Sequence, residues 1–120
     1  MAKRSKQARA REFSPTAREE IELRDRGCIF CRMGYHKEEL TTFEMQNFQI
    51  MHYIPRSQNG LGIPENGAVG CLGHHAMLDN GNKGRAAEMK DLFRGYLMGI
   101  YKNWNESDLV YSKWKGLTSR

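Results

Sequence analysis

The sequence predicts a small α+β domain in which two short strands lie between helices, and three observations predict it. Two Cys/His pairs with a two-residue spacing frame the middle of the chain, at Cys28 with Cys31 and at Cys71 with His74. Between the pairs, spaced apolar residues lead to Pro55 and a short apolar run returns to Cys71, as in two strands. Closer to the C-terminus, apolar residues recur at three- and four-residue steps, the period of an amphipathic helix.

Composition indicates one domain with a small core. The chain has 120 residues, of which only 39% are hydrophobic, so a metal ion bound within the domain is a plausible means of stabilising it. No apolar run is long enough to span a membrane and no sorting signal is recognisable, which predicts a soluble, cytoplasmic protein.

The net charge of +5 is concentrated at the N-terminus. Residues 1–11 contain five cations and no acid, so we expect residues 1–12 to form a flexible basic arm and residues 13–120 to form one domain. Such an arm favours a polyanion partner, most often a nucleic acid, and its cations would contact the DNA backbone. The alternative is a solvated tail without a partner. The cations of the arm are Lys3, Arg4, Lys6, Arg9 and Arg11.

Residues that commonly start or end helices predict three helices. Ser14 as N-cap and Pro15 at the first helical position predict a helix that runs to about Asp25 and ends at Gly27. A second helix is expected from about 72 to 81, where Gly81 suits a C-terminal cap, and a third from about 85 to 104. The apolar stripe of the third helix fits core packing better than a platform for stacked bases.

The central strands are expected at residues 43–53 and 68–70. Pro55 closes the first strand, and the loop at 56–67 is rich in glycine. A loop of this length without regular structure is usually functional or disordered. The segment 109–111, with Trp114, is expected to pack back on the domain as a short strand or turn.

The two Cys/His pairs predict a structural zinc site. A two-residue spacing lets a tight turn direct two side chains at one metal ion, and two such turns supply four ligands. An odd number of cysteines argues against a disulfide framework and fits a reducing compartment. The predicted zinc ligands are Cys28, Cys31, Cys71 and His74.

The segment from 28 to about 81 resembles the HNH endonucleases, also called ββα-metal or His-Me finger nucleases, in their zinc-bound subset. The residues that carry the resemblance are His52-Tyr-Ile-Pro-Arg-Ser, a glycine-rich loop, Asn66, and Cys71-Leu-Gly-His74-His75 at a helix start, with the upstream Cys-x-x-Cys. The core ββα motif would span about 43–81. The runs HYIPRSQNGLG and LDNG are also similar to small phage-encoded HNH proteins.

The resemblance implies a role for each residue of the motif. His52 would be the general base that takes a proton from water, and Asn66 would hold the loop and orient His52. His75 would bind a catalytic divalent ion, Mg²⁺, Mn²⁺ or a similar one, that neutralises the phosphate and stabilises the leaving 3′ oxygen. Arg56 is a candidate phosphate contact.

Two positions depart from the family pattern. His74 stands where the family has a fourth zinc cysteine, and histidine is an ordinary zinc ligand. Met51 stands where the family usually has an Asp or His ligand of the catalytic ion, and a thioether does not serve a hard cation. Asp79, one helical turn after His75, is a candidate replacement, although it can equally be a helix-terminal residue bonded to nearby backbone.

Simpler interpretations stand beside these roles. His52 can be a structural histidine at a strand end, Asn66 a turn residue before Gly67, and Arg56 a solvated loop charge. His36 matches no pattern and is expected at the surface.

The expected function is metal-dependent hydrolysis of DNA phosphodiester bonds, by nicking or double-strand cleavage. If the protein is phage-encoded, the resemblance suggests an association with a genome-packaging terminase in the host cytoplasm. The alternatives are a zinc-knuckle DNA-binding protein without turnover, which Met51 favours, and an adaptor that docks on a packaging complex through its aromatic C-terminal helix.

Overall fold

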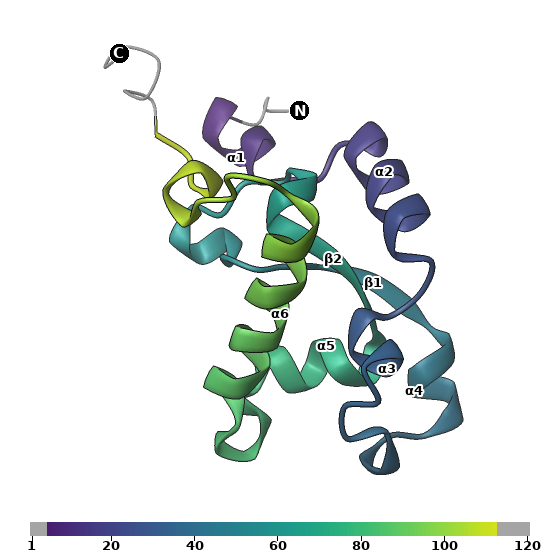
Figure 1. Ribbon diagram of the computed structural model, residues 1–120. Helices are drawn as coiled ribbons and strands as arrows, with labels where there is room; N and C mark the ends of the chain where they lie inside the picture. The colour runs from purple at the N-terminus through teal and green to yellow at the C-terminus, as the bar shows by residue number, and fades with distance from the viewer. Residues whose placement is uncertain (1–4, 113–120) are drawn as a thin grey trace.

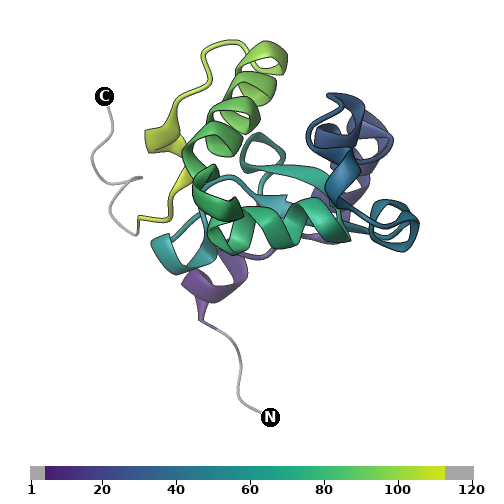
Figure 2. The same ribbon diagram turned by 90° about the horizontal axis from the view of Figure 1, so that it is seen from below.

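The computed structural model describes residues 5–112 and confirms a small α+β architecture built around a two-stranded sheet. The strands run through the middle of the molecule, with α5 and α6 on one side and α2 on the other (Figure 1). Seen from below, α5 lies in front of the strands, and α6 contacts α5 and runs at an angle to it (Figure 2). The elements are α1 (Lys6–Ala10), α2 (Pro15–Asp25), α3 (Ile29–Arg32), α4 (Thr42–Gln46), β1 (Phe48–His52), β2 (Gly67–Cys71), α5 (Leu72–Asp79) and α6 (Ala86–Ile100).

The sheet is an antiparallel pair whose register runs from Phe48 opposite Cys71 to His52 opposite Gly67. All five residues of β2 are buried, because α2, α3 and α5 all contact this strand. In β1 the side chain of Met51 is fully buried, whereas that of its neighbour His52 is only partly buried. The alternation of strand side chains therefore places His52 on the face opposite to Met51.

The core is small and rich in aromatic residues. On α6, Met89, Phe93 and Leu97 are fully buried at four-residue spacing, which confirms that this stripe packs against the core. The ring of Phe93 meets Phe30 and Tyr53 edge to face, with centroids 6.1 and 5.4 Å apart. α6 ends at Ile100, four residues before the expected end of the helix.

The signals for the first long helix are confirmed. Ser14 caps α2 by accepting a hydrogen bond from the Ala17 backbone N–H at 3.1 Å, and Pro15 occupies its first turn. The helix ends at Asp25, and Arg26 takes the left-handed conformation ahead of Gly27. α5 likewise begins at Leu72 as expected, with Cys71 as its N-cap.

Two expectations about local structure are wrong. Residues 43–46 lie in a helix, α4, and not in the strand, which begins only at Phe48. A capping box starts α4: Thr41 accepts from the Glu44 N–H at 3.1 Å, and the Glu44 carboxylate accepts from the Thr41 N–H at 2.8 Å. The N-terminal arm also contains a short helix, α1, for which Ser5 is the N-cap.

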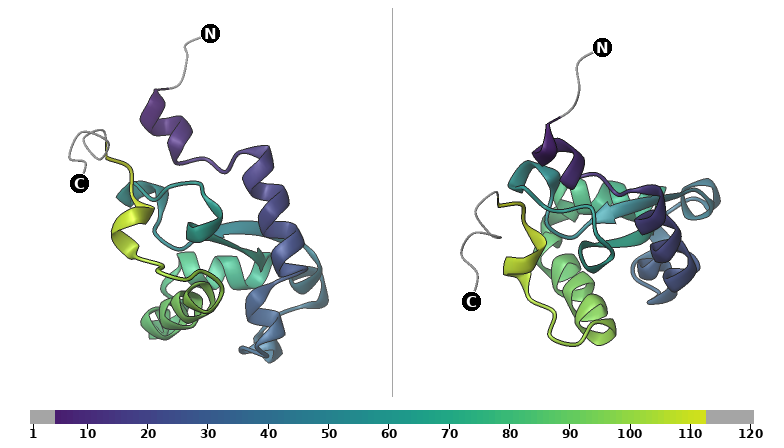
Figure 3. Two further views of the ribbon diagram at one scale, coloured as in Figure 1. Left: turned by 45° about the horizontal axis from the view of Figure 1, so that its top comes forward. Right: turned by 90° about the horizontal axis from the view of Figure 1, so that it is seen from above.

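The described part of the arm is attached to the domain. Gly62 donates its backbone N–H to the Ala10 carbonyl at 2.9 Å, and Gln7 donates its amide to Asn59 at 2.6 Å. In Figure 3 the chain from α1 to α2 runs along the loop between the strands. Lys3, Arg4 and Trp114 lie outside the described residues.

The loop between the strands is ordered by two 3₁₀ turns, Arg56–Gln58 and Pro64–Asn66. The segment near residue 110 packs on this loop, where Leu61 donates to the Leu109 carbonyl at 2.8 Å and Gly60 bridges Val110. Among residues 5–112, no helix combines the length and apolar character needed to cross a membrane.

Candidate functional site

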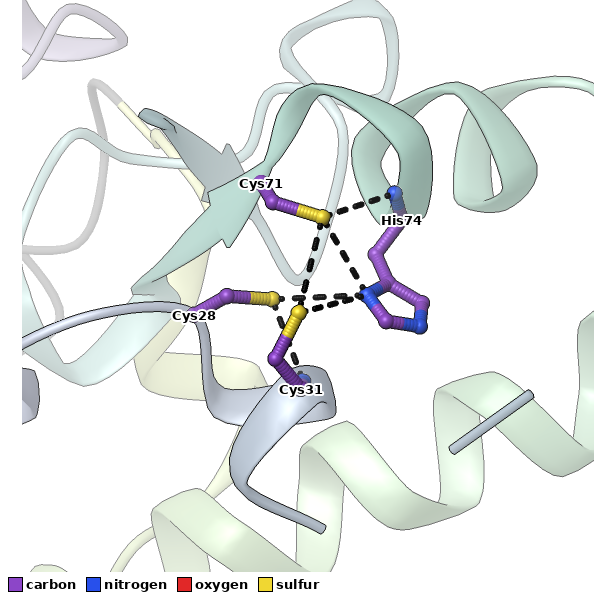
Figure 4. Close-up of side chains that lie close together, drawn as sticks. All are labelled: Cys28, Cys31, Cys71 and His74. Atoms are coloured by element: carbon purple, nitrogen blue, oxygen red, sulfur yellow. Dashed lines mark hydrogen bonds between the residues drawn. The ribbon is translucent and has the colours of Figure 1, made fainter. Parts of the chain in front are cut away.

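The four predicted zinc ligands converge on one point. Cys28 and Cys31 come from the start of α3, and Cys71 and His74 come from the junction of β2 with α5, as Figure 4 shows. Their ligand atoms all lie within 4.8 Å of one another, and only Cys31 is partly exposed. The spacing within each pair therefore produces the cluster that the sequence predicts.

The separations match a tetrahedral zinc ion. With zinc bonds of about 2.3 Å to sulfur and about 2.0–2.1 Å to nitrogen, a tetrahedron requires about 3.8 Å between sulfurs and about 3.6 Å between sulfur and nitrogen. The sulfurs of Cys31 and Cys71 are 3.8 Å apart. His74 Nδ1 lies 3.5, 3.6 and 3.3 Å from the sulfurs of Cys28, Cys31 and Cys71. The group can hold a zinc ion.

Neighbouring backbone groups orient the ligand atoms of His74 and the cysteines towards a common ion. His74 Nε2 lies 2.6 Å from the Tyr35 carbonyl oxygen, which can only accept, so Nε2 carries the proton and Nδ1 keeps its lone pair for the ion. The backbone N–H groups of Cys31 and His74 each donate to a ligand sulfur at 3.4 Å. Burial lowers the pKa of His74, which keeps the ring neutral.

Burial acts in the opposite direction on the thiols. It raises the pKa of Cys28, and it raises the pKa of Cys31 to about 12. Thiolates in this pocket therefore need a cation beside them, and metal binding must release protons.

A cleft of about 740 Å³ adjoins the sheet on the His52 side. The segment before α2, the end of β1, the loop after it, α5 and α6 all contribute to its wall. The charged and polar side chains that line it are Glu12, Arg18, His52, Arg56, Ser57, His75, Asp79 and Lys90. The structure thus brings the predicted residues His52, Arg56, His75 and Asp79 into one cavity.

His52 is held from two sides. Its Nε2 lies 2.8 Å from the Arg11 carbonyl oxygen, and the ring of Phe13 packs on the imidazole with centroids 4.3 Å apart. Burial lowers the pKa of His52 below its ordinary value. The imidazole is therefore neutral near pH 7 and able to accept a proton.

Asn66 fastens the loop that follows His52. Its side chain is fully buried, accepts from the Ile54 N–H at 2.8 Å, and donates to the carbonyls of Ile54 and Leu61 at 3.1 and 2.8 Å. The Asn66 carbonyl also accepts from the Tyr53 N–H at 2.8 Å. Asn66 therefore holds the backbone on the C-terminal side of His52, and among the described contacts it makes no bond to the imidazole itself.

His75 and Asp79 face one another across one turn of α5. His75 Nε2 lies 3.4 Å from a carboxylate oxygen of Asp79, and His75 Nδ1 is hydrogen-bonded to the Gln49 side-chain oxygen. With its Nδ1–H donated to Gln49, the ring directs the Nε2 lone pair towards Asp79, an arrangement that suits a shared cation. In residues 5–112, no third His, Cys, Asp or Glu completes a compact ligand group with this pair.

Met51 cannot belong to the cleft. Its side chain is fully buried in the core and packs against Gly70, where an added Cβ would lie 2.3 Å from the Met51 sulfur. Position 51 therefore does not face the cleft. Ile50, on the same strand face as His52, lines the cleft in its place.

Two cations that line the cleft were not predicted from the sequence. Arg18 reaches it from α2 and Lys90 from α6. The Lys90 ammonium lies 4.3 Å from the centroid of the Tyr53 ring and donates to the Tyr53 carbonyl, and burial lowers its pKa. Neither residue stands near the motif in the chain, so no sequence motif indicated them.

The cations of the arm divide into different environments. Arg11 donates to the Arg56 carbonyl at 3.0 Å, so its side chain is engaged with the loop. Lys6 and Arg9 are exposed on α1. The Arg56 guanidinium lies 3.7 Å from the Glu12 carboxylate at the cleft wall.

A buried charge network was also missed. Asp25 is fully buried, paired with Arg24 at 2.6 Å, and accepts from the Val69 N–H at 2.8 Å. Arg24 donates further to Tyr101 at 2.9 Å and to the Gly67 carbonyl at 2.7 Å. These bonds tie α2 to β2 and to the end of α6, and they lie outside the cleft.

Comparisons with known proteins identify no relative of this chain. No protein-family model matches the sequence, and neither the curated proteins nor the solved structures yield a match.

Proposed function

We propose that the protein is a metal-dependent DNA endonuclease of the HNH class, built on a ββα-metal finger whose structural zinc is held by the Cys3His cluster. The observation that carries the proposal is the cleft, which unites His52, His75 and Asp79 with three cations. The order β1, β2, α5 and the position of His52 at the end of β1 agree with that motif.

The proposed reaction is attack of water on a DNA phosphate. His52 accepts a proton from the water, and the bond from phosphorus to the 3′ oxygen breaks. Arg18, Arg56 and Lys90 offer positive charge to the phosphates on either side. His75 and Asp79 would hold the divalent ion, Mg²⁺ or Mn²⁺, whose charge neutralises the phosphate and stabilises the leaving oxygen. The net charge of +5 favours the same polyanionic substrate.

The test is nicking of supercoiled plasmid with Mg²⁺ or Mn²⁺ by wild type, His52→Ala and His36→Ala. His36 lies outside the cleft and is paired with Glu38, so His36→Ala is the matched control. Loss of the base is expected to lower the rate by about 10²–10⁴-fold, with the zinc content unchanged. Equal rates for wild type and His52→Ala would disprove the proposal.

A second candidate function is DNA binding without turnover. The observation in its favour is the burial of Met51, which leaves the catalytic ion two protein ligands. Metal-independent plasmid binding in a gel shift, with no nicking under any divalent ion, would favour this function. The adaptor interpretation has less support, because Phe93 of α6 is buried in the core. A link to a phage packaging terminase rests on the sequence resemblance alone.

A further inference from the structure

The segment Arg11, Glu12 and Phe13 lies along the cleft and contacts the proposed base directly. The Arg11 carbonyl oxygen lies 2.8 Å from His52 Nε2, and the Phe13 ring packs on the imidazole at a centroid distance of 4.3 Å. Glu12 and Phe13 both line the cleft. The residues expected to be a DNA-binding arm thus continue into a part of the site.

The segment is fixed to the loop between the strands by close backbone packing. Gly62 donates to the Ala10 carbonyl at 2.9 Å, and a Cβ added at Gly62 would lie 2.2 Å from the backbone carbon and oxygen of Glu12. The tip of the Phe13 ring would lie 2.5 Å from a Cβ added at Gly67. Only glycine at these two positions lets the segment approach the loop and strand so closely.

The contact with Arg11 determines which imidazole nitrogen carries the proton. A carbonyl oxygen has no hydrogen to donate, so a hydrogen bond to it requires His52 Nε2 to be protonated. In the neutral ring the other nitrogen, Nδ1, is then the proton acceptor. The Phe13 ring, packed on the imidazole, restricts its rotation about the Cβ–Cγ bond.

We propose that the N-terminal segment is a positioning element for His52: the Arg11 carbonyl fixes the Nε2–H tautomer and Phe13 fixes the ring plane, so that Nδ1 receives the proton from water. This inference rests on the proposed endonuclease activity. It differs from a DNA-binding role, because a positioning element acts on turnover, whereas cations that only bind phosphate act on affinity for DNA.

The test uses the full chain and two matched substitutions, Gly62→Ala and Gly99→Ala. The first displaces Glu12 and Phe13 without touching the reactive atoms. The second adds the same methyl group where, apart from its chain neighbours and the backbone of its own helix, no atom lies within 4 Å. Zinc content reports folding, and steady-state cleavage of a DNA duplex gives kcat and KM. A misplacement of about 1 Å can cost about 100-fold, so kcat of Gly62→Ala is expected to fall by about that factor with little change in KM.

A second readout does not depend on cleavage. A hydrogen-bonded imidazole N–H exchanges slowly enough with water to give a proton signal in spectra of histidine-labelled protein. Wild type is expected to show this signal for His52 Nε2, assigned by its loss in His52→Ala. Gly62→Ala is expected to lose it, whereas the signal of His74 Nε2, bonded to Tyr35, remains as an internal reference.

The outcomes separate this inference from the proposed function. Absence of the His52 Nε2–H signal in wild type overturns the inference even if the protein cleaves DNA, and so does a Gly62→Ala protein that loses the signal but keeps its kcat. If wild type cleaves nothing, the proposed function fails, and with it the catalytic part of the inference, while the spectrum still decides whether the segment holds His52. If Gly62→Ala loses its zinc, Phe13→Leu, which removes the ring from the imidazole, takes its place in the same comparison.

Discussion

Removal of zinc is expected to unfold the protein. The ion would join the start of α3 to the start of α5, two turns that otherwise meet only through the small apolar core. Structural zinc sites supply about 10–16 kcal/mol of binding free energy near pH 7. A whole domain is stable by only about 5–15 kcal/mol. Loss of the zinc-binding free energy is therefore expected to remove all of the free energy of unfolding.

The raised thiol pKa values add a pH dependence to this effect. Because Cys28 and Cys31 hold their protons in the absence of an ion, zinc binding must displace the protons of these two thiols. Zinc affinity is therefore expected to weaken steeply as the pH falls, and acid is expected to unfold the protein through loss of the ion. Titration calorimetry in buffers of different ionisation enthalpy measures the number of protons released.

The assay compares wild type, Cys31→Ala and His36→Ala. Elemental analysis after purification without chelators is expected to give one zinc per chain for wild type and for His36→Ala, and little for Cys31→Ala. Circular dichroism should show loss of helix on chelation and recovery on addition of Zn²⁺. His36 forms a second possible ligand group with the exposed Glu38 and Glu39, so His36→Ala controls for zinc taken up there. Wild type that keeps its fold and thermal midpoint after complete removal of zinc would refute the reasoning.

The other predictions concern the core and the charges. Met51→Asp places a carboxylate in the apolar core and is expected to lower the free energy of unfolding by more than about 3 kcal/mol. It should not reduce the metal concentration that cleavage requires. Met51→Leu should cost less than about 1.5 kcal/mol, and urea denaturation measures both. Because burial lowers the pKa of His52, the base stays neutral below the ordinary value of about 6.5, and the acid limb of the cleavage rate should lie below about pH 6.5. Lys6→Ala and Arg9→Ala should each flatten the salt dependence of DNA affinity by about 0.9 in log–log slope if that residue contacts a phosphate, as filter binding over a salt series will show. Unchanged slopes would mean that these cations make no contact with DNA. Asp25→Asn removes the charge partner of a largely buried arginine and should lower the free energy of unfolding by about 3–5 kcal/mol, seen as a lower thermal midpoint.

The sequence predicted those parts of the fold whose signals are local. Ser14 and Pro15 start α2 because a cap and a preset backbone angle act within one turn, and Gly81 follows α5 in the left-handed conformation. The first strand was misjudged because Phe43 with Met45, and Phe48 with Ile50, are two residues apart like strand residues. Phe43 and Phe48 are nevertheless exposed, by 66% and 56%. Their burial, which the apolar pattern assumes, does not occur. The capping box at Thr41, also legible in the sequence, determines the local structure instead.

The candidate site was predictable to the extent that its chemistry lies in residue type and spacing. Two-residue spacing brought each zinc pair together, and a four-residue spacing brought Asp79 to His75. Lys90 and Arg18 reach the cleft only through tertiary packing of α6 and α2, which no short motif records. The Arg11 contact with His52 uses a backbone carbonyl, a group that every residue carries, so no residue type could have revealed it.

The Cys3His cluster and the cleft meet in the first turn of α5, and this junction would link the stability of the fold to the proposed function. Cys71 caps the helix through its sulfur, His74 turns inward to the cluster and is fully buried, and His75 turns outward to the cleft. Neighbouring residues of a helix point about 100° apart, so one turn can present one histidine to each site but not both to one ion. A zinc ion on His74 would therefore fix the helix that aims His75, while β2, which ends at Cys71, pairs with the strand that ends at His52. A zinc ion bound by the cluster would thus hold the end of β2 and the start of α5 in place, and with them the separation of His52 from His75.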